Sequence, residues 1–164
     1  MEWSIQNGMI QQGFTALLET LKTFLCNQYG IGEHDFETRE LVVAKVLNTV
    51  KCCNNAMKDD INTTVLRAQA LVKEDNYQNL VKYLDDERTP KCARSCKDKA
   101  IKLAFEVPKS LVALYGEIGD YRNDMNHFGF KKQPNKPDTL HKKLKKCYHQ
   151  FCNIVDNYEE QKLK

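Results

Sequence analysis

Residues 121–130 combine an arginine, an amide and a histidine within six positions, Arg122 to His127. Arg122 supplies a permanent cation whose planar fork of N–H donors matches the oxygens of a phosphate group. His127 supplies an imidazole that accepts or releases a proton near neutral pH. A phosphate-binding cation and a proton-transfer group are the two functions needed to cleave RNA without a metal ion, because RNA carries its own nucleophile, the 2′-hydroxyl. The candidate catalytic residues are Arg122, Asn123 and His127.

The spacing of these residues limits how they can cooperate. On an ideal α-helix, positions five apart are separated by about 140° around the axis, so Arg122 and His127 do not share a face. Asn123 and His127 are four apart and do share one. We therefore expect Arg122 and His127 to meet one phosphate where the helix end unwinds towards Gly129. The other arrangement is a composite site, to which a second copy of the helix contributes.

Each of these residues also has an ordinary structural interpretation. Asn123 could be a polar residue late in a helix, and His127 could interact with the helix dipole at the C-terminus. Arg122 could form a surface pair with a neighbour on its helix: Glu117, Asp120 or Asn126. The spacing by itself leaves both interpretations open.

A lysine-rich segment follows the motif, with seven lysines and one acidic residue, Asp138, between Lys131 and Lys146. Such a cluster could guide a phosphate backbone toward the motif with little sequence preference. The alternative for the lysines of the last helix, 142, 143, 145 and 146, is a solvated helix face. The candidate RNA-binding residues are Lys131, Lys132, Lys136, Lys142 and Lys143.

Three aromatic residues flank the motif: Tyr121, Phe128 and Phe130. They could stack on the bases of single-stranded RNA. Packing in a core or a dimer interface is the interpretation that we favour for them.

The elements that must position the motif are helical. Apolar residues recur at three- and four-residue steps almost throughout, and seven glycines and four prolines give few breaks. We predict an all-α fold, a helical bundle with additional short helices. Gly30 should end the first helix, and Pro108 should begin the helix that carries the motif. The expected helices span 2–29, 37–57, 63–73, 76–87, 90–106, 108–127 and, capped by Asp138 or Thr139, a last one to about 158.

Bulk composition favours one folded domain over residues 1–164. Hydrophobic residues make up 41% and charged residues 29% of the chain, which excludes the composition of a disordered protein. No signal peptide and no apolar run long enough to cross a membrane are present, so we expect a soluble, cytoplasmic protein. The seven cysteines are an odd number without zinc-site spacing, which favours reduced thiols, and we expect no metal or cofactor.

Two segments resemble a known family. Arg122-Asn-Asp-Met-Asn-His127 is similar to the Arg-Asn-x-x-x-His signature of the HEPN superfamily of nucleotide-binding domains. The longer stretch 117–130 and the opening segment 2–19 resemble the HEPN effector domains of CRISPR-associated ancillary ribonucleases of type III systems. The middle third, which includes Cys92 and Cys96, carries no such resemblance.

The resemblance implies an antiviral, metal-independent endoribonuclease that acts on single-stranded RNA as a homodimer, with Arg122 and His127 catalytic and Asn123 supporting them. In that family a sensor domain that binds cyclic oligoadenylate precedes the HEPN domain. The abrupt helical start here is consistent with a module excised from a longer chain. The alternatives are a catalytically silent HEPN module that binds a nucleotide or a partner protein, and a helical scaffold whose basic face binds RNA.

Overall fold

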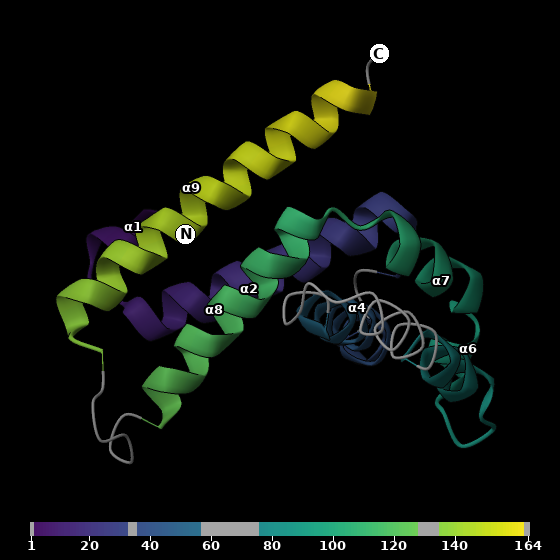
Figure 1. Ribbon diagram of the computed structural model, residues 1–164. Coiled ribbons are helices and arrows are strands. Elements are labelled where there is room, and N and C mark those ends of the chain that lie inside the picture. Colours follow the sequence, from purple (N-terminus) through teal and green to yellow (C-terminus); the bar gives the residue numbers. More distant parts are fainter. Residues whose placement is uncertain (1, 33–35, 57–75, 128–134, 163–164) are drawn as a thin grey trace, which may run out of the picture. The chain divides into compact units, whose positions relative to one another are not determined.

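The computed structural model describes residues 2–32, 36–56, 76–127 and 135–162, and every regular element within these ranges is a helix (Figure 1). The all-α prediction is confirmed. The chain divides into two compact units. Unit 1 comprises residues 1–21 and 108–164, and unit 2 comprises residues 22–107.

Unit 1 contains α1 (Glu2–Gln6), the first half of α2 (Ile10–Tyr29), α8 (Lys109–Asn126) and α9 (Pro137–Lys162). Each of the three longer helices contributes one apolar stripe, which is buried. The close approach of α2 and α9 depends on a small residue, because a β-carbon at Gly13 would collide with the buried side chain of Leu144. The largest buried side chains of this unit are Phe14, Leu17, Leu21, Leu111, Ile118 and Leu144.

Unit 2 contains the rest of α2, α3 (Phe36–Thr38), the π-helical turn η1 (Arg39–Ala44), α4 (Lys45–Ala56), a helical stretch at 76–85, α6 (Lys91–Arg94) and α7 (Lys97–Glu106). The expected helix 37–57 is therefore helical through residue 56 but wider at η1. Lys22 is 2% exposed, and its ammonium group forms an ion pair with Glu40 of η1. Burying a lysine is tolerated here because the charge has a partner.

Gly30 ends α2 as predicted. Its φ of +62° lies in the left-handed region that glycine adopts without strain. The Gly30 N–H donates to the Asn27 carbonyl at 3.4 Å and the Ile31 N–H donates to the Cys26 carbonyl at 2.9 Å. This pair of hydrogen bonds is the Schellman motif, which satisfies the last carbonyls of a helix.

The continuous helix expected over 2–29 is wrong, because the same motif interrupts it at Gly8. Gly8 has a φ of +66°, its N–H donates to the Ile5 carbonyl, and the Met9 N–H donates to the Ser4 carbonyl at 2.9 Å. α1 therefore ends at Gln6 and α2 begins at Ile10. The apolar pattern runs across this break and conceals it.

The other helix boundaries agree with the predicted ones in some places and differ in others. Pro108 stands at the N-cap of α8, close to the predicted start. The helix expected over 90–106 is divided into α6 and α7 by a turn at Ser95 and Cys96. The cap predicted at Asp138 or Thr139 is wrong: α9 begins at Pro137, as is common for proline in a first turn. The helix predicted over 63–73 lies outside the described residues.

Candidate functional site

The three candidate catalytic residues lie at the C-terminal end of α8. Arg122 directly precedes its last turn, Asn123 begins that turn, and His127 is the C-cap residue, with φ −107° and ψ 19°. The His127 N–H donates to the Asn123 carbonyl at 3.0 Å, so the helical bonding continues to the cap. Arg122 and His127 therefore remain on different faces of one helix end. Gly129, towards which unwinding was considered, lies outside the described residues.

The side chains of this motif are available to a ligand. Arg122 is half-buried, and Asn123 and His127 are exposed. None of the three side chains forms a hydrogen bond or an ion pair with a residue in the ranges that the structure describes. None of the surface pairs considered for Arg122, with Glu117, Asp120 or Asn126, is formed in the described ranges. Glu117 accepts a hydrogen bond from Tyr121, and Asn126 accepts one from Gln11.

Tyr121, the residue before Arg122, contacts side chains of two other helices of unit 1, α2 and α9. Its ring lies 5.5 Å from the Phe14 ring of α2, and its hydroxyl donates to Glu117 Oε1 at 2.9 Å. The Lys143 ammonium of α9 donates to the same hydroxyl and lies 4.4 Å from the centre of the ring. Burial raises the pKa of the Tyr121 hydroxyl. Tyr121 thus packs within unit 1, which is the interpretation that the sequence favoured over base stacking. Its contacts fix the backbone next to Arg122. Phe128 and Phe130 lie outside the described residues.

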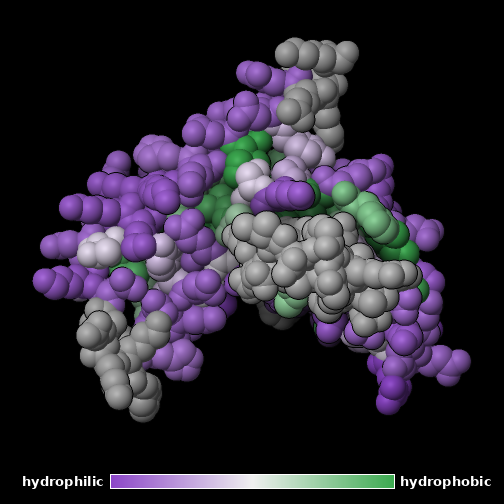
Figure 2. Space-filling model, in the orientation of Figure 1, coloured by the Kyte–Doolittle hydropathy of each residue, from purple (hydrophilic) through white to green (hydrophobic). Residues whose placement is uncertain are grey.

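The predicted RNA-binding lysines fall into three groups. Lys136 and Lys142 are exposed, and neither ammonium group pairs with a carboxylate in the described ranges. Lys143 is half-buried on Tyr121, and its hydrogen bond to that hydroxyl raises the pKa of its ammonium group. Lys131 and Lys132 lie outside the described residues. Hydrophilic side chains cover most of the visible surface over the first half of α9 in the orientation of Figure 1 (Figure 2).

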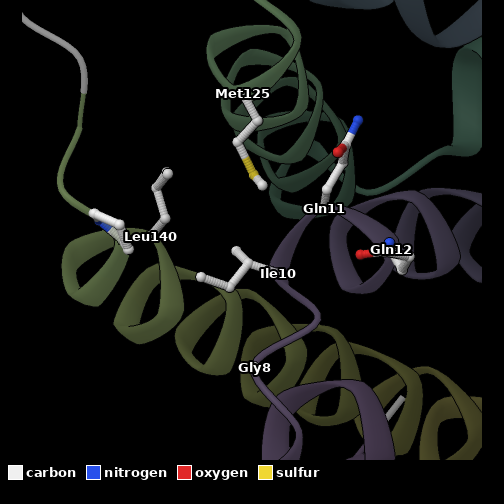
Figure 3. Close-up of a pocket in the computed structure, with 7 residues that line it drawn as sticks. Gly8, Ile10, Gln11, Gln12, Met125 and Leu140 are labelled. Atoms are coloured by element: carbon white, nitrogen blue, oxygen red, sulfur yellow. The ribbon is translucent and has the colours of Figure 1, made fainter. Parts of the chain in front are cut away.

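A cavity of about 320 Å³ adjoins the end of α8. Its walls come from the start of α2 (Ile10, Gln11, Gln12), from Met125 of α8 and from Pro137 and Leu140 of α9. Figure 3 shows the side chains of Met125, Ile10 and Leu140 converging on this space. Gly8 completes the lining, and its missing side chain leaves open space beside it.

Sequence reasoning assigns no role to this cavity. Met125 lies inside the motif, but its spacing marks it only as an apolar residue near a helix end. Ile10, Gln11 and Gln12 lie more than a hundred positions away, and the apolar pattern hides the break at Gly8 that places them. The adjacent glutamines at the start of a helix are the one signal that could have indicated it.

No disulfide joins the cysteines in the ranges that the structure describes. Cys52, Cys92, Cys96, Cys147 and Cys152 are free thiols. Burial raises the pKa of the Cys147 thiol to about 11, which keeps it protonated and poorly reactive. Among the described residues, no three His, Cys, Asp or Glu side chains cluster as metal ligands, and no helix is both long and apolar enough to pass through a membrane.

Comparisons with known proteins add no relative to these observations. No family model, no curated protein and no solved structure matches the chain.

Proposed function

We propose that this chain is a metal-independent endoribonuclease domain that cleaves single-stranded RNA and acts as a homodimer. The observation that carries the proposal is the end of α8, where a forked cation, an amide and an imidazole lie within six residues and are not used by the fold. The resemblance of residues 117–130 to HEPN ribonucleases supports the same assignment. The resemblance further implies that the domain acts in CRISPR antiviral defence and is controlled by a sensor domain that binds cyclic oligoadenylate.

The proposed reaction is an internal transfer at phosphorus. The ribose 2′-oxygen attacks the adjacent phosphate and loses its proton to a base, and the bond to the 5′-oxygen breaks as that oxygen gains a proton. The products are a 2′,3′-cyclic phosphate and a 5′-hydroxyl. Arg122 stabilises the charge that develops on the phosphate oxygens, His127 transfers a proton, and Asn123 orients the phosphate or the imidazole. DNA resists because it lacks the attacking hydroxyl.

A dimer is part of the proposal because of the geometry of one helix end. Arg122 and His127 are separated by about 140° around α8, so one copy does not aim both side chains at one phosphate. A second copy whose α8 end approaches the same phosphate supplies the missing group. The symmetric arrangement is the commonest one for two copies of one chain.

Cleavage of a fluorescent single-stranded RNA in EDTA tests the reaction. We expect cutting by the wild-type protein, and a loss of at least about a hundredfold in Arg122→Ala and in His127→Ala, the usual size for a charge-stabilising or proton-transfer group. Arg88→Ala and His149→Ala remove exposed residues of the same types outside the motif and should cut normally. Undiminished cutting by both motif variants, with the helical circular dichroism retained, would refute the assignment.

Two other outcomes identify the alternatives. RNA or nucleotide binding without any cleavage would point to a silent HEPN module or an RNA-binding scaffold. Cleavage that EDTA abolishes would point to a metal-dependent site instead.

Mixing the two inactive variants tests the composite site. A heterodimer of Arg122→Ala with His127→Ala can combine the intact arginine of one chain with the intact histidine of the other. If half of the dimers are mixed and each has one of two sites, cutting recovers to about a quarter of the wild-type rate. Mixtures that stay as inactive as the separate variants, although subunits exchange, would place each site within one chain.

A further inference from the structure

The cavity beside the motif has the composition of a site for a flat, partly polar molecule. Ile10, Met125 and Leu140 form apolar walls, and the exposed amides of Gln11 and Gln12 lie at its side. Its volume of about 320 Å³ lies at the lower end of the range typical of small-molecule sites. Apolar walls with a few amide groups suit a heterocyclic base, which offers two flat faces and a hydrogen-bonding edge.

The position of the cavity connects it to the phosphate-binding residue. Met125 and Asn126 are three and four residues after Arg122, so the three lie on one side of α8, about one turn apart. Three residues correspond to a rise of about 4.5 Å along the helix. A nucleotide with its phosphate at Arg122 therefore has its base within reach of the Met125 wall.

The structure also holds one of the amides in place. Gln11 Nε2 donates to Asn126 Oδ1 at 2.9 Å, which joins the start of α2 to the last turn of α8. The side-chain oxygen of Gln11, Oε1, remains available as an acceptor. A base edge presents N–H donors to such a group. Without this bond, fixing a glutamine side chain would cost rotamer entropy when a ligand binds.

Charge at the rim agrees with a nucleotide ligand. Lys136 is exposed and immediately precedes Pro137 of the cavity wall. A cation at this position can contact the phosphate on the far side of a bound base, because phosphates alternate with bases along a single strand.

We infer that this cavity binds one unpaired base of the RNA, next to the phosphate that is cut. The inference rests on the proposed ribonuclease function and adds a base subsite to it. The base lies against Met125 and Ile10, its edge pairs with the Gln11 amide, and its own phosphate reaches Arg122. The subsite requires a base whose hydrogen-bonding edge is not already paired. It therefore favours flexible single strands over duplexes.

A binding experiment tests the subsite without any cleavage. The ligand is a tetranucleotide of 2′-O-methyl RNA, which has no attacking hydroxyl, and its partner compound lacks one internal base. With ¹³C-methyl methionine labelling, the Met125 signal, identified by its loss in Met125→Leu, should shift with the intact tetranucleotide. It should stay in place with the compound that lacks the base at the bound position. Equal shifts with both compounds, or none with either, overturn the subsite.

A cleavage experiment tests the same subsite by filling it. Replacing either base that flanks the cut by a ribose spacer that keeps its 2′-hydroxyl should slow wild-type cutting at one of the two positions by about tenfold or more, the usual worth of one stacked base. Ile10→Phe fills the cavity and should abolish that difference. Ile154→Phe makes the same change in a half-buried isoleucine that lines a separate cavity of unit 1 and should retain it.

The two experiments separate the subsite from the ribonuclease proposal. Equal cutting of base-bearing and spacer substrates, with an unmoved Met125 signal, overturns the subsite and leaves the ribonuclease intact. A Met125 shift that requires the base, in a protein that cuts no RNA, supports the subsite and overturns the ribonuclease.

Discussion

Arginines in the two units are used differently. In unit 2, Arg88 bonds to both carboxylate oxygens of Asp86, the shortest contact being 2.6 Å, and Arg94 Nε donates to the Thr89 carbonyl at 2.9 Å. In unit 1, Arg122 has no such partner among the described residues. Exposure does not explain the difference, since the Arg88 side chain is 90% exposed, whereas Arg122 is half-buried.

The comparison shows how a structural arginine differs from one that is available for binding. The donors of Arg88 and Arg94 stabilise the turn that links the helix at 76–85 to α6. The backbone of Arg122 is fixed because the residue belongs to α8. The packing contact with Phe14 and the hydrogen bond to Glu117 are made by its neighbour, Tyr121. A guanidinium group that is positioned but unpaired has its five donors free for an external anion.

The largest expected effect separates charge from shape at Arg122. Arg122→Lys keeps the cation but loses the planar fork, and we expect RNA cutting to fall by about a hundredfold. Arg88→Lys makes the same change at the structural arginine and should leave cutting unchanged. Full activity in Arg122→Lys would mean that only a point charge is needed, and initial rates in EDTA measure the difference.

A smaller effect contrasts two neighbouring lysines of α9. Lys143→Met removes both the hydrogen bond to Tyr121 and the contact with its ring, so the free energy of unfolding should fall by about 1 kcal/mol. Lys142→Met alters an exposed side chain and should change it by less than about 0.5 kcal/mol. Urea denaturation measures both. Equal stabilities would show that Lys143 is as available to RNA as Lys142.

The salt dependence of RNA binding tests the exposed lysines. If Lys136 and Lys142 contact phosphates, each change to alanine should reduce the slope of log K against log salt concentration by about 0.7, the value for one contact to a single strand. In a background of His127→Ala, which prevents cutting, fluorescence anisotropy at several salt concentrations gives the slope. Lys82→Ala, an exposed lysine of unit 2, is the control, and a slope that matches it would remove both lysines from the interface.

The smallest effect concerns the paired arginine. The hydrogen bonds from Arg88 lower the pKa of Asp86 from 3.8 to about 2. Because the folded state holds the proton less tightly than the unfolded state, this carboxylate stabilises the fold above about pH 4, and the contribution disappears as the pH falls toward 2. Carboxyl NMR titration should show the low pKa, and Arg88→Ala should return it toward 3.8. An unchanged pKa in the variant would separate the two residues.

Local signals in the sequence predicted the helices better than their interruptions. Apolar periodicity identifies α2, α8 and α9, and Gly30 and Pro108 mark true helix ends because glycine and proline restrict the backbone directly. Gly8 breaks a helix within an unbroken apolar pattern, and its positive φ depends on where the chain must turn. Ser95 and Cys96 likewise form the turn between α6 and α7, although neither of them is a glycine or a proline.

The sequence predicted which residues make up the candidate site, but not which side chains surround them. Arg122, Asn123 and His127 are found at a helix end, as the motif and its nearby glycine suggested. Their relation to Gln11, Lys143 and Tyr121 depends on which side chains meet across helices. Periodicity gives the face of each helix but not the register of one helix against the next, so these contacts do not follow from the sequence pattern.

The division of unit 1 between both ends of the chain has a consequence for its synthesis. The stripe of α2 that carries Phe14 and Leu17 leaves the ribosome early, whereas Leu140 and Leu144 of α9 follow more than 120 residues later. At ribosomal speeds of ~5–20 residues per second, that stripe waits roughly 6–25 seconds for its partners. Residues 22–107 are contiguous and are complete before then. The motif at the end of α8 is thus assembled late in translation, after the unit without it is already synthesised.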